Sequence, residues 1–321
     1  MHRTCLSLAT SLVATLAHAQ SADHVLCDRL ATPRTRAQYR PQAEARIAAG
    51  GPAADFFRGC LVWDEDRSDA SIKLFEAATQ APTATSDHFL WLGNAYGVKA
   101  QRSNVITQGR LAGKVKNAFD RAVQLDPTNV AARDGLMQYY LQAPGIMGGS
   151  ITKAEEQARS IKKLNAYRGG FALASVLARR KDAAGAEREL AGVYAAFPDS
   201  IDALGAAINA HAQQSHHAAA WALLDGAQKG ALATHPRLPF LIGRAAALSG
   251  EQLERGEAAL LAYLRTSPGP DDPRPTNAQL RLGQIYEKMG KTEQARAAYR
   301  TALALDGRNE AAKRALKTLG G

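Results

Sequence analysis

Small and apolar residues recur along this chain at offsets of four and then three, and a helix stop follows five positions later. Offsets of three and four place side chains on one face of an α-helix, so each occurrence predicts a helix that buries one stripe. In five of seven occurrences the stop is proline or glycine, residues that end helices. The stripes and stops are Ala70, Leu74, Ala77, Pro82; Val115, Phe119, Ala122, Pro127; Ala154, Ala158, Ile161, Ala166; Ala186, Leu190, Val193, Pro198; Ala220, Leu224, Ala227, Leu232; Gly256, Leu260, Tyr263, Pro268; and Ala295, Tyr299, Ala302, Gly307.

The stripes belong to a longer internal repeat. The segments AVQLDPTNVAARDGL from Ala122 and ALALDGRNEAAKRAL from Ala302 agree at seven of fifteen positions. A matching first helix precedes the second helices, most clearly as LGNAY at Leu92–Tyr96 and LGQIY at Leu282–Tyr286. Successive stripes lie 32 to 45 residues apart, and such a period predicts stacked helix pairs.

One unit carries a recognisable signature, formed by Leu282, Gly283, Tyr286, Gly290, Ala295, Tyr299 and Ala302. The chain resembles a tetratricopeptide-repeat protein of the exported bacterial type, from about Ala53 to its end. The resemblance implies an all-α, right-handed α-solenoid of about seven helix pairs over residues 51–321. A capping helix is expected at Arg308–Leu319.

The N-terminal segment predicts export. MHRTCLSLATSLVATLAHA has a positive head, a short apolar run and an A-x-A site, so residues 1–19 are interpreted as a signal peptide cleaved after Ala19. The apolar run is too short to span a bilayer, and no stable membrane insertion is expected. Residues 20–50 form a helical lead-in, with helices expected at Asp23–Leu30 and Pro41–Ala49. The expected location is periplasmic or secreted.

Two cysteines remain after cleavage, Cys27 and Cys60. Thiols tend to oxidise outside the cytosol, so a disulfide is predicted; two buried free thiols are the alternative. A bridge over this span contributes about 3.5 to 4 kcal/mol in the chain-entropy model.

The composition says more about the kind of partner that the protein binds than about any catalytic chemistry. The formal charge of +10 favours an anionic partner, which could be an acidic protein, an anionic lipid or a glycan. The 46% hydrophobic and 6% aromatic content predicts a large core made mostly of small aliphatic side chains. An exported chain without a nucleic-acid motif is not expected to bind nucleic acid. One basic insert, with Lys99, Arg102, Arg110, Lys114 and Lys116, is either a solvated face or a docking surface.

The glycine-rich segment from Ala143 to Ser150, APGIMGGS, matches neither a Walker loop nor a dinucleotide fingerprint. Thr152 and Glu155 predict a capping box at the next helix. The segment is therefore interpreted as a corner between two helices.

The sequence patterns that could indicate a metal site or a catalytic site are weak. His211, His216 and His217 have gaps of five and six across a turn, unlike the gaps of three or four typical of one-helix zinc ligands. The acidic run Asp64, Glu65, Asp66 and Asp69 lacks the glycine and glutamate of a calcium loop. No catalytic residue, cofactor or metal is predicted.

The resemblance implies a peptide-binding groove lined by the first helices. Position by position, the groove residues are Asn94, Gln138, Arg168, Ser175, Arg179, Asn209, Arg244, Arg281 and Gln284. The family's carboxylate clamp is incomplete, because Leu90 stands where it requires lysine. Amide groups can satisfy a peptide backbone, and guanidinium groups can bind carboxylates with two hydrogen bonds.

The sequence thus predicts a non-catalytic exported scaffold that binds a protein or peptide, and it leaves the oligomeric state open. One alternative is a polyanion-binding envelope protein that uses the basic insert and residues 288–321, which hold eight basic and three acidic side chains. A hydrolase on a helical scaffold is the other alternative.

Overall fold

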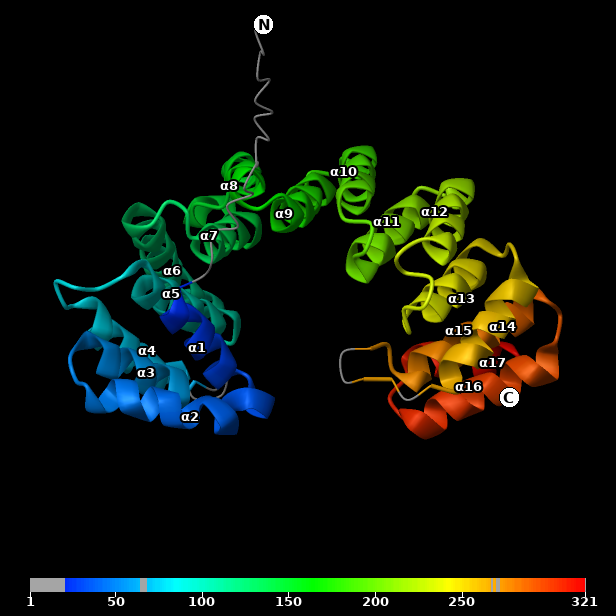
Figure 1. The fold of residues 1–321 in the computed structure, drawn as a ribbon, viewed down its shortest axis with the longest axis horizontal. Helices are drawn as coiled ribbons and strands as arrows, with labels where there is room; N and C mark the ends of the chain where they lie inside the picture. Colours follow the sequence, from blue (N-terminus) through cyan, green and yellow to red (C-terminus); the bar gives the residue numbers. More distant parts are fainter. Residues whose placement is uncertain (1–20, 64–67, 267, 270–271, 321) are drawn as a thin grey trace, which may run out of the picture. The chain divides into compact units, whose positions relative to one another are not determined.

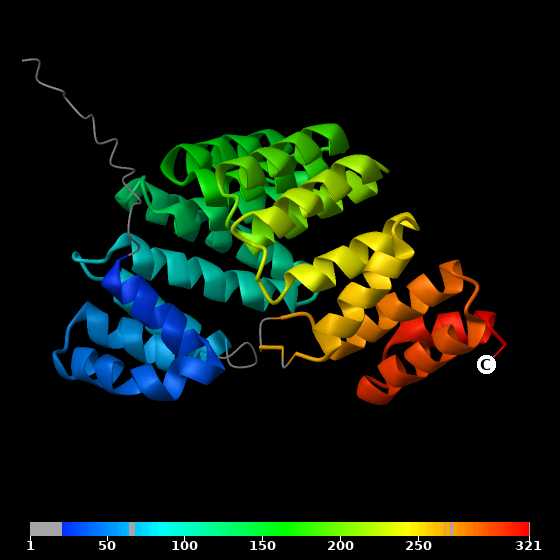
Figure 2. The same ribbon diagram turned by 45° about the vertical axis from the view of Figure 1, so that its right-hand side comes forward.

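The computed structural model describes residues 21–63, 68–266, 268–269 and 272–320, and all regular structure in these ranges is helical. The predicted signal peptide and the acidic residues at 64–66 lie outside them. The chain divides into two compact units, residues 1–169 and 170–321, which are drawn in Figures 1 and 2 and described separately below. No described helix is long and apolar enough to cross a membrane.

Unit 1 is built from two lead-in helices followed by helix pairs. Its elements are α1 Ala22–Ala31, α2 Pro33–Ala48, α3 Pro52–Leu61, α4 Ser68–Thr79, α5 Ser86–Gln101, α6 Val105–Leu125, α7 Val130–Gln142, the 3-10 turn η2 Gly145–Met147, and α8 Ile151–Leu164. The next helix, α9 Ala166–Arg179, crosses the boundary between the units. Unit 2 continues with α10 Ala183–Ala196, α11 Ile201–Gln213, α12 His217–Lys229, α13 Leu238–Ser249, α14 Leu253–Leu264, α15 Pro275–Lys288, α16 Thr292–Leu305 and α17 Glu310–Thr318.

The predicted helix pairs are confirmed. In the described chain, seven pairs run from α3/α4 to α15/α16, with α9 and α10 in contact at Gly170 and Val193, and α17 packs on α16 as the capping helix. Within each unit the first helices of successive pairs also touch: α5 packs on α7, α11 on α13, and α13 on α15. We call the surface formed by these first helices the first-helix face.

Close contact between a small first-helix residue and a large second-helix residue holds the pairs together. A Cβ atom at Gly93 would lie 2.7 Å from the ring of Phe119, and one at Gly243 would lie 2.2 Å from Leu260. Such distances are below van der Waals contact, so glycine is required where the two helices approach most closely.

Six of the seven predicted stripes face the core, and the first is wrong by one residue. Ala70 and Ala77 are exposed, whereas Ser71, Phe75 and Ala78 are fully buried. Phe75 determines this register, because its ring packs against Gly59 of the preceding helix.

The lead-in is more helical than predicted. Helix α2 begins at Pro33 and contains Pro41 in its interior, although the sequence predicted a helix starting at Pro41. Cys27 of α1 and Cys60 of α3 are both fully buried and form a disulfide, with Cα atoms 5.4 Å apart. The covalent bond ties the lead-in to the first repeat.

The glycine-rich segment is a corner between α7 and α8, as predicted, but its cap differs. Ser150 is the N-cap of α8 and accepts a hydrogen bond from the Lys153 amide, so the predicted Thr152 and Glu155 capping box is wrong. Gly148 adopts a φ of 94°, which favours glycine. The Tyr139 hydroxyl donates to the Met147 carbonyl and holds the corner against α7.

Candidate functional site

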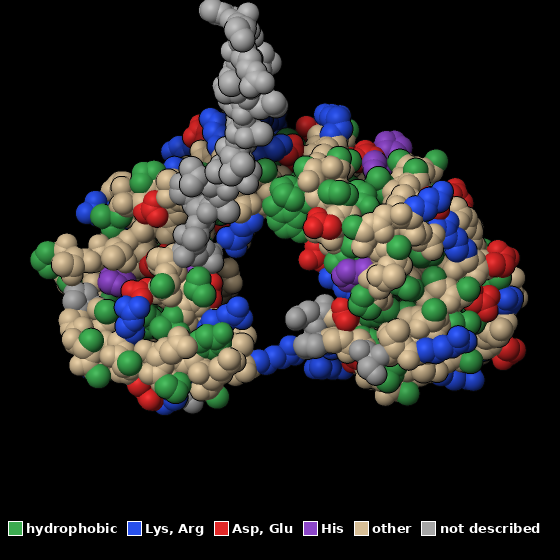
Figure 3. Space-filling view, in the orientation of Figure 1, with side chains coloured by type: hydrophobic (Ala, Val, Ile, Leu, Met, Phe, Trp, Pro, Cys, Tyr) green, Lys and Arg blue, Asp and Glu red, His purple; other side chains and the backbone are tan. Residues whose placement is uncertain are grey.

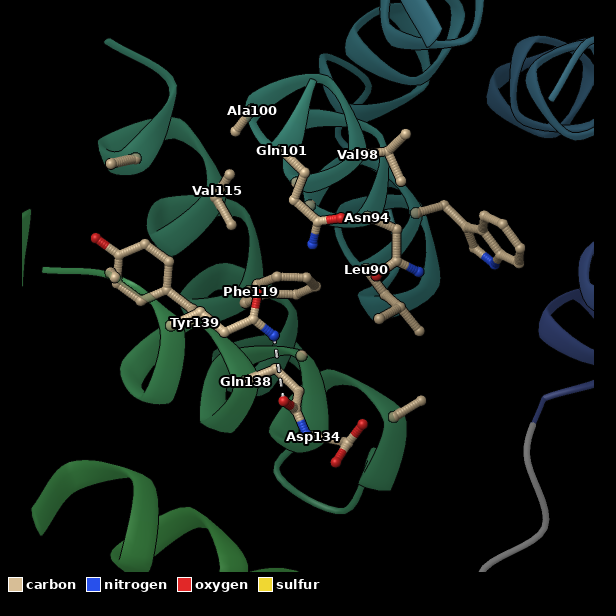
Figure 4. A pocket seen from close by; sticks show the side chains of 18 of the residues that line it. Leu90, Asn94, Val98, Ala100, Gln101, Val115, Phe119, Asp134, Gln138 and Tyr139 are labelled. Atoms are coloured by element: carbon tan, nitrogen blue, oxygen red, sulfur yellow. Dashed lines mark hydrogen bonds between the residues drawn. The ribbon is translucent and has the colours of Figure 1, made fainter. Parts of the chain in front are cut away.

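A pocket of about 690 Å³ opens on the first-helix face of unit 1. Helices α5, α6 and α7 supply most of its wall, and Trp63 and Met147 contribute from connecting segments. The volume is in the range of pockets that hold a small ligand or a few peptide side chains. Figure 4 shows the labelled side chains that converge on it.

The polar part of this pocket contains three of the predicted groove residues, Asn94, Gln138 and Arg168. Asp134 lies one turn before Gln138 on α7, and both side chains face the pocket in Figure 4. The Asp134 side chain is exposed, but the protein around it still desolvates its carboxyl group and raises its pKa, while Arg168 and a hydrogen bond with Gln138 partly offset that rise. The pocket thus offers amide groups, the carboxyl groups of Asp28 and Asp134, and one guanidinium group to a ligand.

The apolar part of the pocket is aromatic. Trp63 and Trp91 pack edge to face with ring centroids 5.6 Å apart, and Phe119 and Tyr139 also line the wall. The Trp91 indole Nε1 is buried and has no hydrogen-bond partner among the described residues. An unsatisfied buried donor is costly, so other contacts of unit 1 must offset this unfavourable feature of the aromatic wall.

Ion pairs within unit 1 neutralise much of the positive charge of the basic insert. Lys99 pairs with Asp69, Lys114 lies 3.5 Å from Glu76, and Lys116 pairs with Asp120 in the next turn of α6. On the face shown in Figure 3, lysine and arginine side chains are interspersed with carboxylates. This pairing reduces the free positive charge that polyanion binding through the insert would need.

Unit 2 places two predicted groove residues, Arg244 of α13 and Arg281 of α15, on adjoining first helices. Burial lowers the pKa of Arg244. Burial also lowers the pKa of Arg281, and the positive charge of Arg244 lowers it further. Among the described residues neither guanidinium forms an ion pair with a carboxylate, so two partly buried positive charges repel each other at this surface.

The hydrogen bonds of the two arginines are incomplete. Arg281 Nη1 donates to Gln284 Oε1 at 2.8 Å, which brings a third predicted residue into the group. The Nε atom of Arg244 is buried and has no partner in the described structure. We call Arg244 and Arg281 the arginine pair.

The remaining predicted groove residues are not brought into either group. Ser175 and Arg179 are exposed on α9, and Asn209 is half-buried on α11. None of the three lines the pocket of unit 1.

Some site residues were missed at the sequence level. Asp134 could have been found, because it precedes Gln138 by one helical turn and so shares its face. Trp63 carries no such signal, since it lies after the end of α3. The spacing typical of ligands on one helix did not anticipate that the turn between α11 and α12 brings His211 and His216 together on Glu187.

Comparison with known proteins supports the repeat assignment. Residues 276–309 match the family model described as tetratricopeptide repeat. A tetratricopeptide-repeat protein from Parabacteroides merdae is 12% identical, with 84% of this chain and 99% of that chain covered and a TM-score of 0.53. Yeast Tom70 is also 12% identical, with 89% of this chain and 58% of that chain covered and a TM-score of 0.58. The comparison with curated proteins found no match.

At these identities the structural similarities concern the fold alone. Together with the matched repeat at residues 276–309, they show a fold of helix pairs that pack as in tetratricopeptide-repeat solenoids.

Proposed function

We propose that this tetratricopeptide-repeat protein is a non-catalytic, exported scaffold that binds an acidic segment of a partner protein on its first-helix faces. The arginine pair is the observation that carries the proposal. Two partly buried guanidinium groups without an acidic partner are unfavourable by themselves. A carboxylate from a partner would relieve their repulsion and supply charge-assisted hydrogen bonds.

The pocket of unit 1 provides the second element of recognition. Its aromatic wall can take an apolar side chain, while Asn94 and Gln138 offer amide groups for a peptide backbone. Export is part of the proposal: the sequence of residues 1–19 predicts a signal peptide, and Cys27 and Cys60 would oxidise in the compartment that it implies.

The test uses a fluorescein-labelled decapeptide of alternating glutamate and alanine, with fluorescence anisotropy as the readout. We expect Arg244→Gln/Arg281→Gln to weaken binding about tenfold or more, because hydrogen bonds to charged groups contribute roughly 1.5–3 kcal/mol. Raised salt should weaken binding to the unmodified chain.

The matched control is Arg300→Gln, which removes an exposed arginine from the second helix α16. It should change the affinity less than twofold. Equal affinities of the unmodified chain and the double variant would contradict the proposal, as would equal binding of a glutamine and alanine peptide.

A further inference from the structure

We propose that Glu187, His211 and His216 form a Zn²⁺ site in unit 2, at the turn between α11 and α12. These three residues come from α10, the last turn of α11 and the N-cap of α12. One possible ligand atom from each lies within 4.8 Å of the others. The cluster involves neither the arginine pair nor the pocket of unit 1.

The geometry of the cluster is already close to that of a metal site. The Nδ1 atoms of His211 and His216 each lie 2.6 Å from the same Glu187 oxygen, Oε1. Tetrahedral zinc with bonds of about 2.0–2.1 Å separates its ligand atoms by roughly 3.3 Å. Side-chain shifts of less than about 1 Å would therefore admit the ion between the three groups.

The backbone orients the two histidines. His216 N–H donates to the His211 carbonyl at 2.9 Å, and this bond closes the turn between the helices. Ser215 adopts a φ of 58° within that turn. His211 and His216 are five residues apart in the sequence, but their side chains lie close together because the chain reverses direction between them.

The three side chains differ in burial, as expected for a metal site that is open to solvent on one side. Glu187 is 9% exposed at its side chain, His211 14% and His216 58%. The buried carboxylate would anchor the ion, while the His216 ring is free enough to adjust its position. Histidine side chains reach the surface over the α10 to α12 region in Figure 3, so the ion would have direct access from solvent.

The ligand set selects the kind of metal. Two imidazole nitrogens and one carboxylate oxygen suit zinc, whereas calcium and magnesium prefer oxygen ligands throughout. In the bound state each imidazole would carry its proton on Nε2 and leave Nδ1 free to bind the ion. Three protein ligands leave a fourth position for water or a group from a partner.

The experiment is a Zn²⁺ titration of the chelator-treated, untagged chain, followed by calorimetry and by competition with a chromophoric zinc indicator. We expect one zinc ion per chain, and a weakening of about tenfold or more in His216→Asn and in Glu187→Gln. His217→Asn is the matched control, since His217 is the next residue and is not part of the cluster. It should keep the affinity of the unmodified chain.

A second readout separates metal binding from a structural hydrogen-bond cluster. Zinc that binds the folded chain should raise the melting temperature, and His216→Asn should remove that increase. His216 is largely exposed, so this variant is expected to fold, which circular dichroism would verify. The proposal is overturned if the unmodified chain binds no more zinc than His216→Asn, or if His217→Asn weakens binding equally.

Discussion

Gly283 lies so close to Tyr299 that a Cβ atom at position 283 would be 2.3 Å from Cε1 of the tyrosine ring. Tyr299 is fully buried, and its hydroxyl donates to Glu287 on the same first helix as Gly283. The contact joins α15 to α16 within the unit that best matches the tetratricopeptide repeat.

Substitution of this glycine should destabilise unit 2. Gly283→Ala gains about 1 kcal/mol of helix propensity but forces overpacking that costs roughly 1–3 kcal/mol, so we expect a net loss. The measurement is thermal unfolding by circular dichroism. Gly226→Ala in α12 is the control: nothing lies within 4 Å of the added Cβ, and the melting temperature should rise slightly.

His88 should make the stability of unit 1 sensitive to acid. Burial lowers the pKa of His88 from the usual 6.5, and nearby Asp87 and Asp23 only partly offset this effect. Its Nδ1 accepts a hydrogen bond from the Thr85 amide at 3.3 Å, which protonation at that atom would break. Because the pKa of His88 is lower in the folded chain, the unfolded chain binds more protons than the folded chain at mildly acidic pH. The free energy of unfolding should therefore fall as the pH drops below about 6.5, by at most about 1.4 kcal/mol per pH unit.

The test is urea unfolding between pH 7.5 and 5.0, with tryptophan fluorescence in a Trp221→Phe background so that Trp63 and Trp91 report unit 1. His88→Gln can keep the cap, because glutamine also accepts at this helix position. It should flatten the pH dependence. An equal slope in both proteins would refute the role assigned to His88.

The disulfide should be measurable by counting thiols. The mature chain, cleaved after Ala19 as proposed, keeps only Cys27 and Cys60, so alkylation under denaturing, non-reducing conditions should label no thiol, and reduction should expose two. Cys27→Ala/Cys60→Ala should lower the unfolding free energy of unit 1 by about 2–5 kcal/mol. Two labelled thiols before reduction would show that the bond does not form.

In the corner after α7, substitution should be tolerated at Gly145 and should be destabilising at Gly149. A Cβ atom at Gly149 would lie 1.8 Å from the Ala143 carbonyl oxygen, and the backbone must shift to relieve that clash. Gly149→Ala should therefore lower stability by roughly 1–3 kcal/mol and disturb the pocket wall at Met147. Gly145→Ala meets no atom within 4 Å, so its melting temperature should stay close to that of the unmodified chain.

Much of the candidate site could be inferred from repeat positions. Asn94, Gln138 and Arg168 do line one pocket, and Arg244, Arg281 and Gln284 do lie together. Equivalent positions in successive repeats share a face because first helices pack side by side. The repulsion within the arginine pair could not be inferred, since it depends on how deeply each guanidinium is enclosed.

The periodicity of apolar residues by itself determined the helix pairs, their order and the capping helix, because which face of a helix is apolar is a local property of its sequence. It could not determine the register of the first stripe, because the predicted set of Ala70, Leu74 and Ala77 is followed one residue later by a second set with apolar members, Ser71, Phe75 and Ala78. The packing of Phe75 against Gly59 fixed the register of that stripe. Nor could spacing reveal the cluster of Glu187, His211 and His216, because residues on three helices meet only through the turns and contacts that fix those helices in space.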